Sequence, residues 1–219
     1  MSAAREQILA RVRRGLKRDE PLTADVVTQL EARTTAHESA VRPALGADLV
    51  ARFTEKLSAV SGRVIPVPAM VDATDGLLAY LDEFDLPRSA VVSQGGLVDE
   101  MVWPEGMAVE RRVARGSDHL SVTGAFCAVA ETGTVVLLSA PESPTSLNFL
   151  PDDHIVLLGR SQLLPHLEDV WHKLREEVGD MPRTVNLVTG PSKTADVEQT
   201  IQLGAHGPRR FAVILVEQA

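Results

Sequence analysis

Residues 188–217, VTGPSKTADVEQTIQLGAHGPRRFAVILVE, decide how the chain is interpreted. A short apolar run ends in a Gly-Pro turn at 190–191, a helix is expected over 195–204, and an apolar strand is expected over 211–216. A turn between the end of a strand and the start of a helix gathers free backbone N–H groups at the positive end of the helix dipole. The stretch therefore predicts a binding site for a phosphate or carboxylate, or simply a helix start capped by Thr194.

The chain on the amino-terminal side of this stretch repeats the pattern of short Val- and Leu-rich runs separated by helical segments. Strands are expected at 63–67, 90–93, 108–112, 155–158 and 185–188, and helices at 74–84 and 161–178. Two further apolar runs, 125–130 and 135–138, are separated by a short segment that includes a glycine, which suits a hairpin or a bent strand. The alternation predicts an α/β fold with a mainly parallel sheet covered by helices on both faces.

The first 60 residues read differently, as helical segments joined by a polar linker. Apolar positions recur at helical spacing over 3–18, 23–33 and 47–60. These residues carry a net charge of +2, whereas the rest of the chain carries −10. We therefore expect an N-terminal helical extension over 1–60 and one α/β domain over 61–219, with the basic first helix as a solvated face or a docking surface.

Composition argues against several classes of function. The 219 residues have a formal net charge of −8, which is unfavourable for broad binding to nucleic acid or to an anionic membrane. No stretch reaches the roughly 18–20 apolar residues that span a bilayer, and no signal-peptide core follows Met1, so a cytoplasmic protein is expected. Cys127 is the only cysteine, and one thiolate cannot hold an iron–sulfur cluster. We expect no cofactor to be bound by this chain alone.

Residues beside the expected strands could carry chemistry. Glu131 directly follows an apolar run, where loss of solvent can raise the pKa of a carboxyl group; a turn carboxylate that accepts backbone N–H bonds is the alternative. His154 precedes an expected strand and His206 lies in the turn before the last strand, positions where loops meet a sheet. His166 and His172 stand six residues apart, on different faces of a helix, so no metal site is predicted.

Common nucleotide and hydrolase motifs are missing from the sequence. The chain has no Gly-x-Ser-x-Gly elbow and no Walker lysine motif, and the Gln-Gly-Gly loop at 94–96 does not complete a dinucleotide fingerprint. Ser192 stands in a sharp turn beside Lys193, where it is better suited to contact an anion than to act as a nucleophile. Nicotinamide and ATP chemistry are therefore not predicted.

Five motifs follow one another in the second half of the chain. They are VTGA at 122–125, AETGT at 130–134, LPDDHI at 150–155, TGPSKTADVEQT at 189–200 and LGAHGP at 203–208. In this order and spacing they resemble the lactate utilization protein C family, whose defining unit is the LUD domain. The resemblance is strongest over 122–219, and the first 60 residues match only as a helical lead-in.

The resemblance implies a three-layer α/β/α fold similar to that of the sugar-phosphate isomerase and CoA-transferase superfamily (NagB/RpiA/CoA-transferase-like). It also implies a role beside two iron–sulfur partner proteins in oxidising L-lactate to pyruvate. The single cysteine agrees with clusters carried by those partners. In relatives of this fold a glutamate often performs the covalent or proton-transfer step, and Glu131 is assigned that role by analogy of fold.

Three interpretations of function remain open at this point. The chain is an accessory component of a lactate-oxidising complex, which binds a small carboxylate or phosphate and docks its partners through the N-terminal helices. Alternatively, it is a free-standing isomerase- or transferase-like enzyme for a phosphorylated or CoA-linked metabolite, with Glu131 as base or nucleophile and His206 or His154 as proton partner. Finally, the motifs serve only to pack strands against helices. The expected anion-binding residues are Thr132, Gly133, Thr134, Gly190, Ser192, Lys193, Thr194 and Asp196.

Overall fold

Short Val-, Ile- and Leu-rich runs form a central six-stranded sheet in the computed structural model, which describes residues 3–17, 22–36, 42–194 and 202–219. The strands are β1 (Arg63–Val67), β2 (Ser89–Val92), β3 (Ala108–Glu110), β4 (Leu120–Gly124), β7 (Asp153–Gly159) and β12 (Arg210–Val216), in the spatial order β1-β12-β7-β4-β2-β3. Every neighbouring pair is parallel. The expected parallel sheet is therefore confirmed.

The middle of this sheet is the most buried part of the protein. Every residue of β7 is buried, and so is every residue of β12 after Arg210, as is typical of parallel strands that are covered on both faces. The first strand of the sheet, β1, is an edge strand, and its neighbour is the last strand, β12, with Arg63 opposite Ala212 and Val67 opposite Val216. Residues far apart in the sequence thus complete the sheet.

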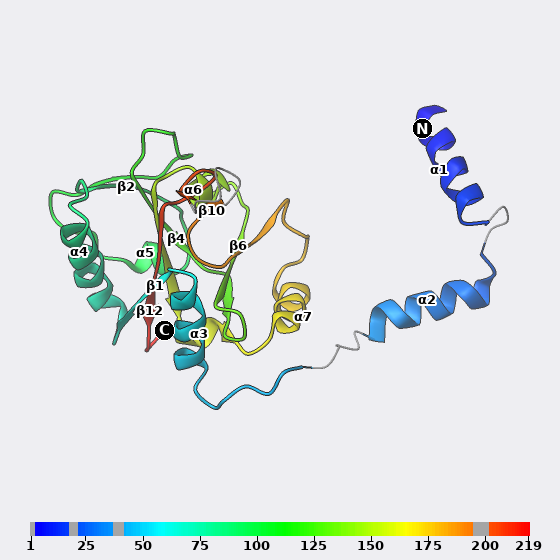
Figure 1. Ribbon diagram of the computed structural model, residues 1–219, viewed down its shortest axis with the longest axis horizontal. Helices are drawn as coiled ribbons and strands as arrows, with labels where there is room; N and C mark the ends of the chain where they lie inside the picture. Colours follow the sequence, from blue (N-terminus) through cyan, green and yellow to red (C-terminus); the bar gives the residue numbers. More distant parts are fainter. Residues whose placement is uncertain (1–2, 18–21, 37–41, 195–201) are drawn as a thin grey trace. The chain divides into compact units, whose positions relative to one another are not determined.

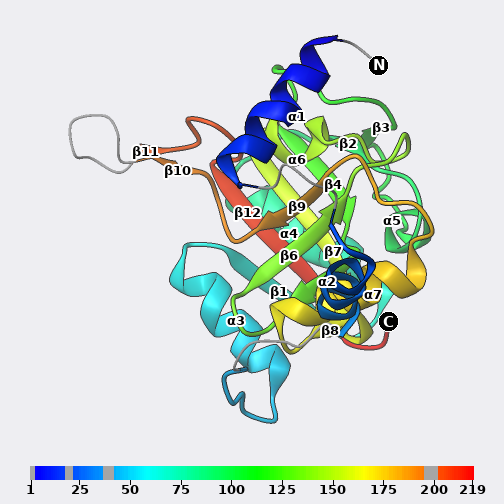
Figure 2. The ribbon, with the colours of Figure 1, turned by 90° about the vertical axis from the view of Figure 1, so that its right-hand side faces the viewer.

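A second, four-stranded sheet covers part of one face of the first (Figures 1 and 2). Its strands are β5 (Cys127–Val129), β6 (Thr134–Leu138), β8 (Leu163–Leu164) and β9 (Val185–Val188), in the order β8-β5-β6-β9. β5 and β6 form an antiparallel hairpin with Cys127 opposite Val136, which confirms the hairpin expected from the sequence. One side of the fold therefore contains a sheet as well as helices.

Helices cover both faces of the central sheet (Figure 1). The helices of this α/β unit are α3 (Leu49–Ala59), α4 (Ala73–Glu83), α5 (Leu97–Glu100), α6 (Ser146–Phe149) and α7 (Leu167–Glu177), with 3-10 turns η1 (Met70–Asp72) and η2 (Arg160–Gln162). α4 and α5 pack on one face, and α3 packs on the other together with the second sheet. α7 covers the outer side of the second sheet through Val170 and Leu174. The expected α/β architecture with helices on both sides is confirmed.

A buried ionic network ties α4 to the sheet. The Asp153 carboxylate, which is fully buried, accepts hydrogen bonds from the Tyr80 hydroxyl at 2.7 Å and from Arg210 Nε and an Arg210 terminal nitrogen at 2.5 and 2.7 Å. Burial and the bond to Asp153 raise the pKa of Tyr80, and the bond to Asp153 raises the pKa of Arg210. A buried carboxylate is tolerated here because three hydrogen bonds from two residues satisfy it.

The described residues fall into two compact units, one up to Arg42 and one from Pro43 onward. The first contains α1 (Ala3–Gly15) and α2 (Ala24–Ala36). α3 belongs to the second unit because it buries Phe53 and Leu57 in the core, so this division falls earlier than the boundary at residue 60 expected from the sequence. No helix among the described residues is both long and apolar enough to cross a lipid bilayer.

Two expected helices differ from the observed elements. The helix expected over 161–178 begins only at Leu167, because Leu163 and Leu164 pair in parallel with Ala128 and Val129 as strand β8. Of the helix expected over 195–204, residues 195–201 lie outside the described part of the chain. β10 (Lys193–Thr194) and β11 (Gln202–Leu203) form an antiparallel ladder, so the prediction was wrong for residues 202 and 203.

Candidate functional site

A pocket of about 280 Å³ opens at the carboxyl ends of β2, β4 and β7. β2 continues through α5 to β3 on one side, whereas β4 continues through the second sheet and α6 to β7 on the other side. The two connections leave neighbouring strands in opposite directions, which makes this place a topological switch point. Open parallel sheets bind ligands in the crevice outside the strand ends at such a point, so this pocket is the candidate functional site.

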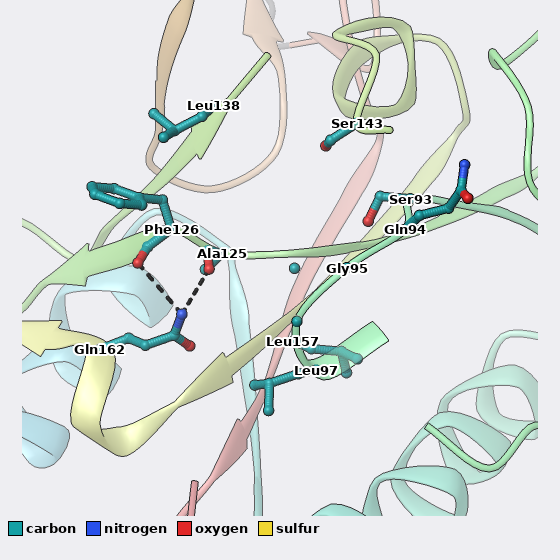
Figure 3. A pocket seen from close by; sticks show the side chains of 12 residues that line it. Ser93, Gln94, Gly95, Leu97, Ala125, Phe126, Leu138, Ser143, Leu157 and Gln162 are labelled. Atoms are coloured by element: carbon teal, nitrogen blue, oxygen red, sulfur yellow. Dashed lines mark hydrogen bonds between the residues drawn. The ribbon is translucent and has the colours of Figure 1, made fainter. Parts of the chain in front are cut away.

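Segments that are distant in the sequence line the pocket (Figure 3). Its walls are the loop 93–97 after β2, the bend 124–126 after β4, and the side chains of Leu138, Ser143, Leu157 and Gln162. The hydroxyl groups of Ser93 and Ser143 point into the space between these walls. Neither serine was predicted from the sequence to be a site residue; the only signal was the glycine pair that follows an expected strand.

The glycine pair gives the loop after β2 its shape. Gly95 and Gly96 have φ values of +91° and +54°, a region that favours glycine, and a Cβ at either position would meet no atom within 4 Å. The Gly95 N–H donates to Asp99 Oδ2 at 2.9 Å, and the other Asp99 oxygen pairs with Arg111 at 3.0 Å. The loop is thereby held in place while its backbone stays open to the pocket.

The opposite wall is held by Gln162. Its Nε2 donates to the carbonyl oxygen of Ala125 at 2.8 Å, and its Oε1 accepts from the Gly159 N–H at 2.8 Å. The Gln94 N–H donates to the Glu142 carbonyl oxygen at 3.0 Å and joins the glycine loop to the segment that carries Ser143. Because these bonds fix the walls, the pocket is preorganised.

Two of the predicted anion-binding segments meet in space, at a different place from the pocket. The Thr134 hydroxyl lies 2.7 Å from the hydroxyls of both Thr132 and Thr189, and Val135 pairs with Val188 where β6 meets β9. The structure thus brings the 131–134 turn beside the 189–193 segment, 55 residues further along the chain.

The glycines of these two segments are packed against α3 and its end. Gly133 has φ +69°, and a Cβ there would lie 2.5 Å from the backbone nitrogen of Leu57. Gly190 has φ +84°, and a Cβ there would lie 3.0 Å from Val60 Cγ2. Both positions therefore need glycine for close approach of the backbones, which is a structural requirement whatever else these segments do.

Lys193 and Ser192 have partners within the protein. Lys193 Nζ donates to Ser61 Oγ at 3.0 Å, just past the carboxyl end of α3, where a cation is favoured by the negative end of the helix dipole. The Ser192 N–H donates to the Pro208 carbonyl oxygen at 2.8 Å. Thr194 lies in β10, and Asp196 lies outside the described residues. Lys193 and Thr194 are thus extended, and the helix start expected at residue 195 lies outside the described residues.

Glu131 lies beside His166, a contact that was not predicted from the sequence. Its Oε2 lies 3.1 Å from Nδ1 of His166, and the two side chains are 24% and 13% exposed. His166 is held at the start of α7, where its backbone N–H donates to Asp169 Oδ2 at 3.1 Å. A carboxylate that orients an imidazole is common in general-base catalysis, but neither residue lines the pocket at the switch point.

His154 and His206 lie in contrasting environments. His154 is fully buried; its Nε2 is 2.8 Å from the Thr123 hydroxyl, and its ring meets Phe211 edge-on at 5.4 Å between centroids. Burial lowers the pKa of His154 to about 3, so its ring is neutral at pH 7. His206 lies exposed in the turn before β12. Among the described contacts, none joins either histidine to Glu131; their catalytic roles stay predictions.

Asn148 adds a second buried polar group near the start of β7. Its side chain is 1% exposed, and neither its amide nitrogen nor its amide oxygen has a hydrogen-bond partner among the described residues; the same holds for His154 Nδ1. The neighbouring Leu147 carbonyl accepts from Ser121 Oγ, and Ser121 stands opposite His154 in the register of β4 and β7. α6 therefore packs on β4 and β7, and His154 belongs to β7.

Within the described residues, no group of three or more His, Cys, Asp or Glu side chains is placed to hold a metal ion. Cys127 is buried under α7, and burial raises the pKa of its thiol to about 12. A buried thiol of this kind is a poor metal ligand and a poor nucleophile because it stays protonated.

Known proteins resemble the chain over much of its length. A protein of Neisseria meningitidis serogroup B is 37% identical over 131 residues, which cover 57% of this chain and 55% of that protein. Lactate utilization protein C of Anoxybacillus flavithermus is 30% identical over 118 residues, 54% of this chain and 53% of the relative, and that of Geobacillus kaustophilus is 29% identical over 175 residues, 78% and 69%. The first two matches span about half the length of those relatives.

A solved structure and a family model agree with these matches. The crystal structure of a DUF162 family protein from Deinococcus radiodurans superposes with a TM-score of 0.59 at 21% identity, covering 80% of this chain and 99% of that one, which establishes likeness of fold. Residues 110–216 match the model of the LUD domain, and this range contains the second sheet and the strands β4, β7 and β12. The likeness to the LUD domain family therefore lies in residues 110–216, just under half of the chain.

Proposed function

We propose that this protein is a component of L-lactate utilization, acts with iron–sulfur partner proteins in the oxidation of L-lactate to pyruvate, and binds a small ligand in the switch-point pocket. The observation that carries the proposal is the position of a preorganised pocket where a LUD domain strand, β4, meets β2. The names of the Anoxybacillus and Geobacillus relatives support the pathway. A volume of about 280 Å³ suits a small metabolite.

The division of labour with partner proteins is supported by the chemistry of this chain. Oxidation of a hydroxy acid to a keto acid releases electrons that need an acceptor. The only cysteine is buried and keeps its proton, so this chain offers no thiolate set for an iron–sulfur cluster. Electron carriers would accordingly reside in the partners. The basic first helix, with Arg13 and Arg14 in its last turn, is the proposed docking element for them.

A small carboxylate or phosphate at residues 190–194 stays part of the proposal. Lys193 is exposed and has a neutral partner, Ser61, so its positive charge is available to an anion. The test is a thermal-shift panel with L-lactate, pyruvate and inorganic phosphate on the parent chain and on Lys193→Ala. A shift that this substitution removes would support the anion site, whereas an identical shift in both proteins would place the anion elsewhere.

The pathway itself is tested by deleting the gene that encodes the chain. We expect the deletion strain to lose growth on L-lactate as sole carbon source, to keep growth on pyruvate, and to recover when the chain is supplied again. Pull-down from lactate-grown cells should recover proteins that contain iron and acid-labile sulfide. Normal growth of the deletion strain on L-lactate would contradict the proposal.

A matched pair of variants connects growth to the pocket. Ser143→Leu puts an aliphatic side chain into the pocket, whereas Ser58→Leu makes the same change on the exposed side of α3. The first variant should fail to restore growth on L-lactate and the second should restore it, with both proteins folded by circular dichroism. Restoration by both variants would remove the pocket from the proposal.

A further inference from the structure

The described walls of the pocket at the switch point carry no charged side chain. Among the described residues that form its walls, none is Asp, Glu, Lys, Arg or His. Asp99, which accepts from Gly95 N–H in the glycine loop, pairs with Arg111 at 3.0 Å. The two charges therefore satisfy each other, and neither residue lines the pocket.

The walls divide into an apolar side and a hydrogen-bonding side. Leu97, Phe126 and Leu138 contribute hydrocarbon surface, and Ser93 and Ser143 contribute hydroxyl groups that point into the space (Figure 3). The Ser93 side chain is 3% exposed, so a ligand that reaches it gives up nearly all of its water on that side. The polar contacts of Gln162, by contrast, are taken up by the backbone of the walls.

A lining of this kind discriminates by charge. A hydroxyl donates only one hydrogen bond, and a carboxylate has about four acceptor sites, so the two serines alone leave much of an anion unsatisfied once it is desolvated; the Gly95 N–H is already bonded to Asp99. Burial of an ionised group without a cation is far more costly than burial of a neutral amide or carbonyl. A neutral group with one polar edge and one apolar side matches the two kinds of wall.

We propose that the switch-point pocket selects a small uncharged carbonyl or hydroxyl compound, such as an amide or ester, over the free carboxylate of the same shape. This inference rests on the proposed function only in taking the pocket as a ligand site. It assigns the recognition to the hydroxyls of Ser93 and Ser143 on one side and to Phe126 and the leucines on the other. Any carboxylate handled by the protein is then held outside this pocket.

The test uses a pair of probes that differ in charge and hardly in shape, L-lactamide and L-lactate. Isothermal titration of the full-length chain at pH 7.5 should give a dissociation constant for L-lactamide at least about tenfold lower than for L-lactate, as expected when one buried polar contact is lost or gained. Ser143→Leu should abolish L-lactamide binding, and Ser58→Leu should leave it unchanged.

The other possible results of the titration would contradict the proposal in distinguishable ways. L-Lactate that binds as tightly as L-lactamide, with the same loss in Ser143→Leu, would overturn the charge selectivity and leave the pocket as a ligand site, with backbone N–H groups serving the anion. Binding of neither probe would overturn the selectivity and the pocket together. Growth of the deletion strain on L-lactate is measured in a separate experiment. A failure of the proposed pathway role can therefore be distinguished from a failure of charge selectivity or of ligand binding in the pocket.

Discussion

At the scale of single residues, the buried amide of Asn148 makes a direct prediction. A buried polar group without a partner costs about 1–3 kcal/mol, and both polar atoms of this side chain lack one among the described residues. Asn148→Leu keeps the number of side-chain heavy atoms and removes the two unpaired polar atoms. We expect the free energy of unfolding in urea to stay level or to rise by about 1 kcal/mol. A fall of more than about 2 kcal/mol would mean that the amide is hydrogen-bonded in solution.

His154 predicts a pH dependence of stability. Its pKa is lowered to about 3 by burial, below its value in the unfolded chain, so between these two values the unfolded state binds a proton that the folded state does not. Stability from this group is present above pH 6.5 or so and is lost as the pH falls toward 3, by up to about 1.4 kcal/mol per pH unit.

The measurement is urea unfolding between pH 7 and pH 4.5 for the parent chain and for His154→Leu. The parent should lose stability more steeply than the variant in this range, because leucine has no proton to bind. Parallel profiles would show that His154 titrates normally and is therefore hydrated in the folded state.

Single residues also show where sequence reasoning stops. His154 was predicted to precede a strand that starts at Ile155, but β7 begins at Asp153, so His154 lies within the strand and is fully buried. The partner of Glu131 was not visible, because His166 is 35 residues away and reaches Glu131 only through the pairing of β5 with β8. A two-residue strand such as β8 has no periodicity to detect.

At the scale of elements, the turn between β5 and β6 predicts a large effect of one methyl group. Gly133→Ala forces a Cβ to within 2.5 Å of Leu57 N, at a positive φ that disfavours alanine. The unfolding free energy should fall by about 2–3 kcal/mol. Gly116→Ala is the control, since a Cβ there meets no atom within 4 Å and should change stability by less than about 0.5 kcal/mol. Equal urea midpoints for both variants would contradict the close packing on α3.

Regular elements were the most predictable part of the structure. Strands β1 and β9 coincide with the expected 63–67 and 185–188, because short runs rich in Val, Ile and Leu and bounded by turn residues favour strands. The helix expected from residue 161 starts only at Leu167, because Leu163 and Leu164 fit a helical stripe as well as they fit a strand. Pro165 lies between strand β8 and helix α7.

At the scale of the whole molecule, the bonds of Asp153 join α4, β7 and β12 into one unit. Arg210→Ala leaves the fully buried carboxylate without its cation, which typically costs about 3–5 kcal/mol. Arg88→Ala breaks an exposed pair with Asp82 and should cost less than about 1 kcal/mol. Thermal unfolding of both variants measures the difference. If both lose the same small amount, the network contributes little to the fold.

The switch-point pocket forms only when distant segments of the whole molecule come together, and for this reason the sequence indicated it poorly. The pocket is assembled from loops after β2 and β4 and from Ser143 and Gln162, and no one segment contains enough of it to form a motif. The fold class follows from local patterns that each segment displays by itself. The meeting of Thr134 with Thr189 depends on the order of strands, which local patterns leave undetermined.

The pairing of β1 with β12 constrains how the protein is made. While a ribosome synthesises the chain from its amino end, β1 emerges early, and its neighbour in the sheet emerges only with residues 210–216. Until then the backbone N–H and C=O groups of β1 have no partner strand, and β1 cannot join the rest of the sheet, because β12 lies between β1 and β7. Contacts of such long sequence separation slow folding and prolong exposure of strand edges. Nascent chains stalled before residue 210 should therefore bind holdase chaperones, and release should follow only when the last strand has left the exit tunnel.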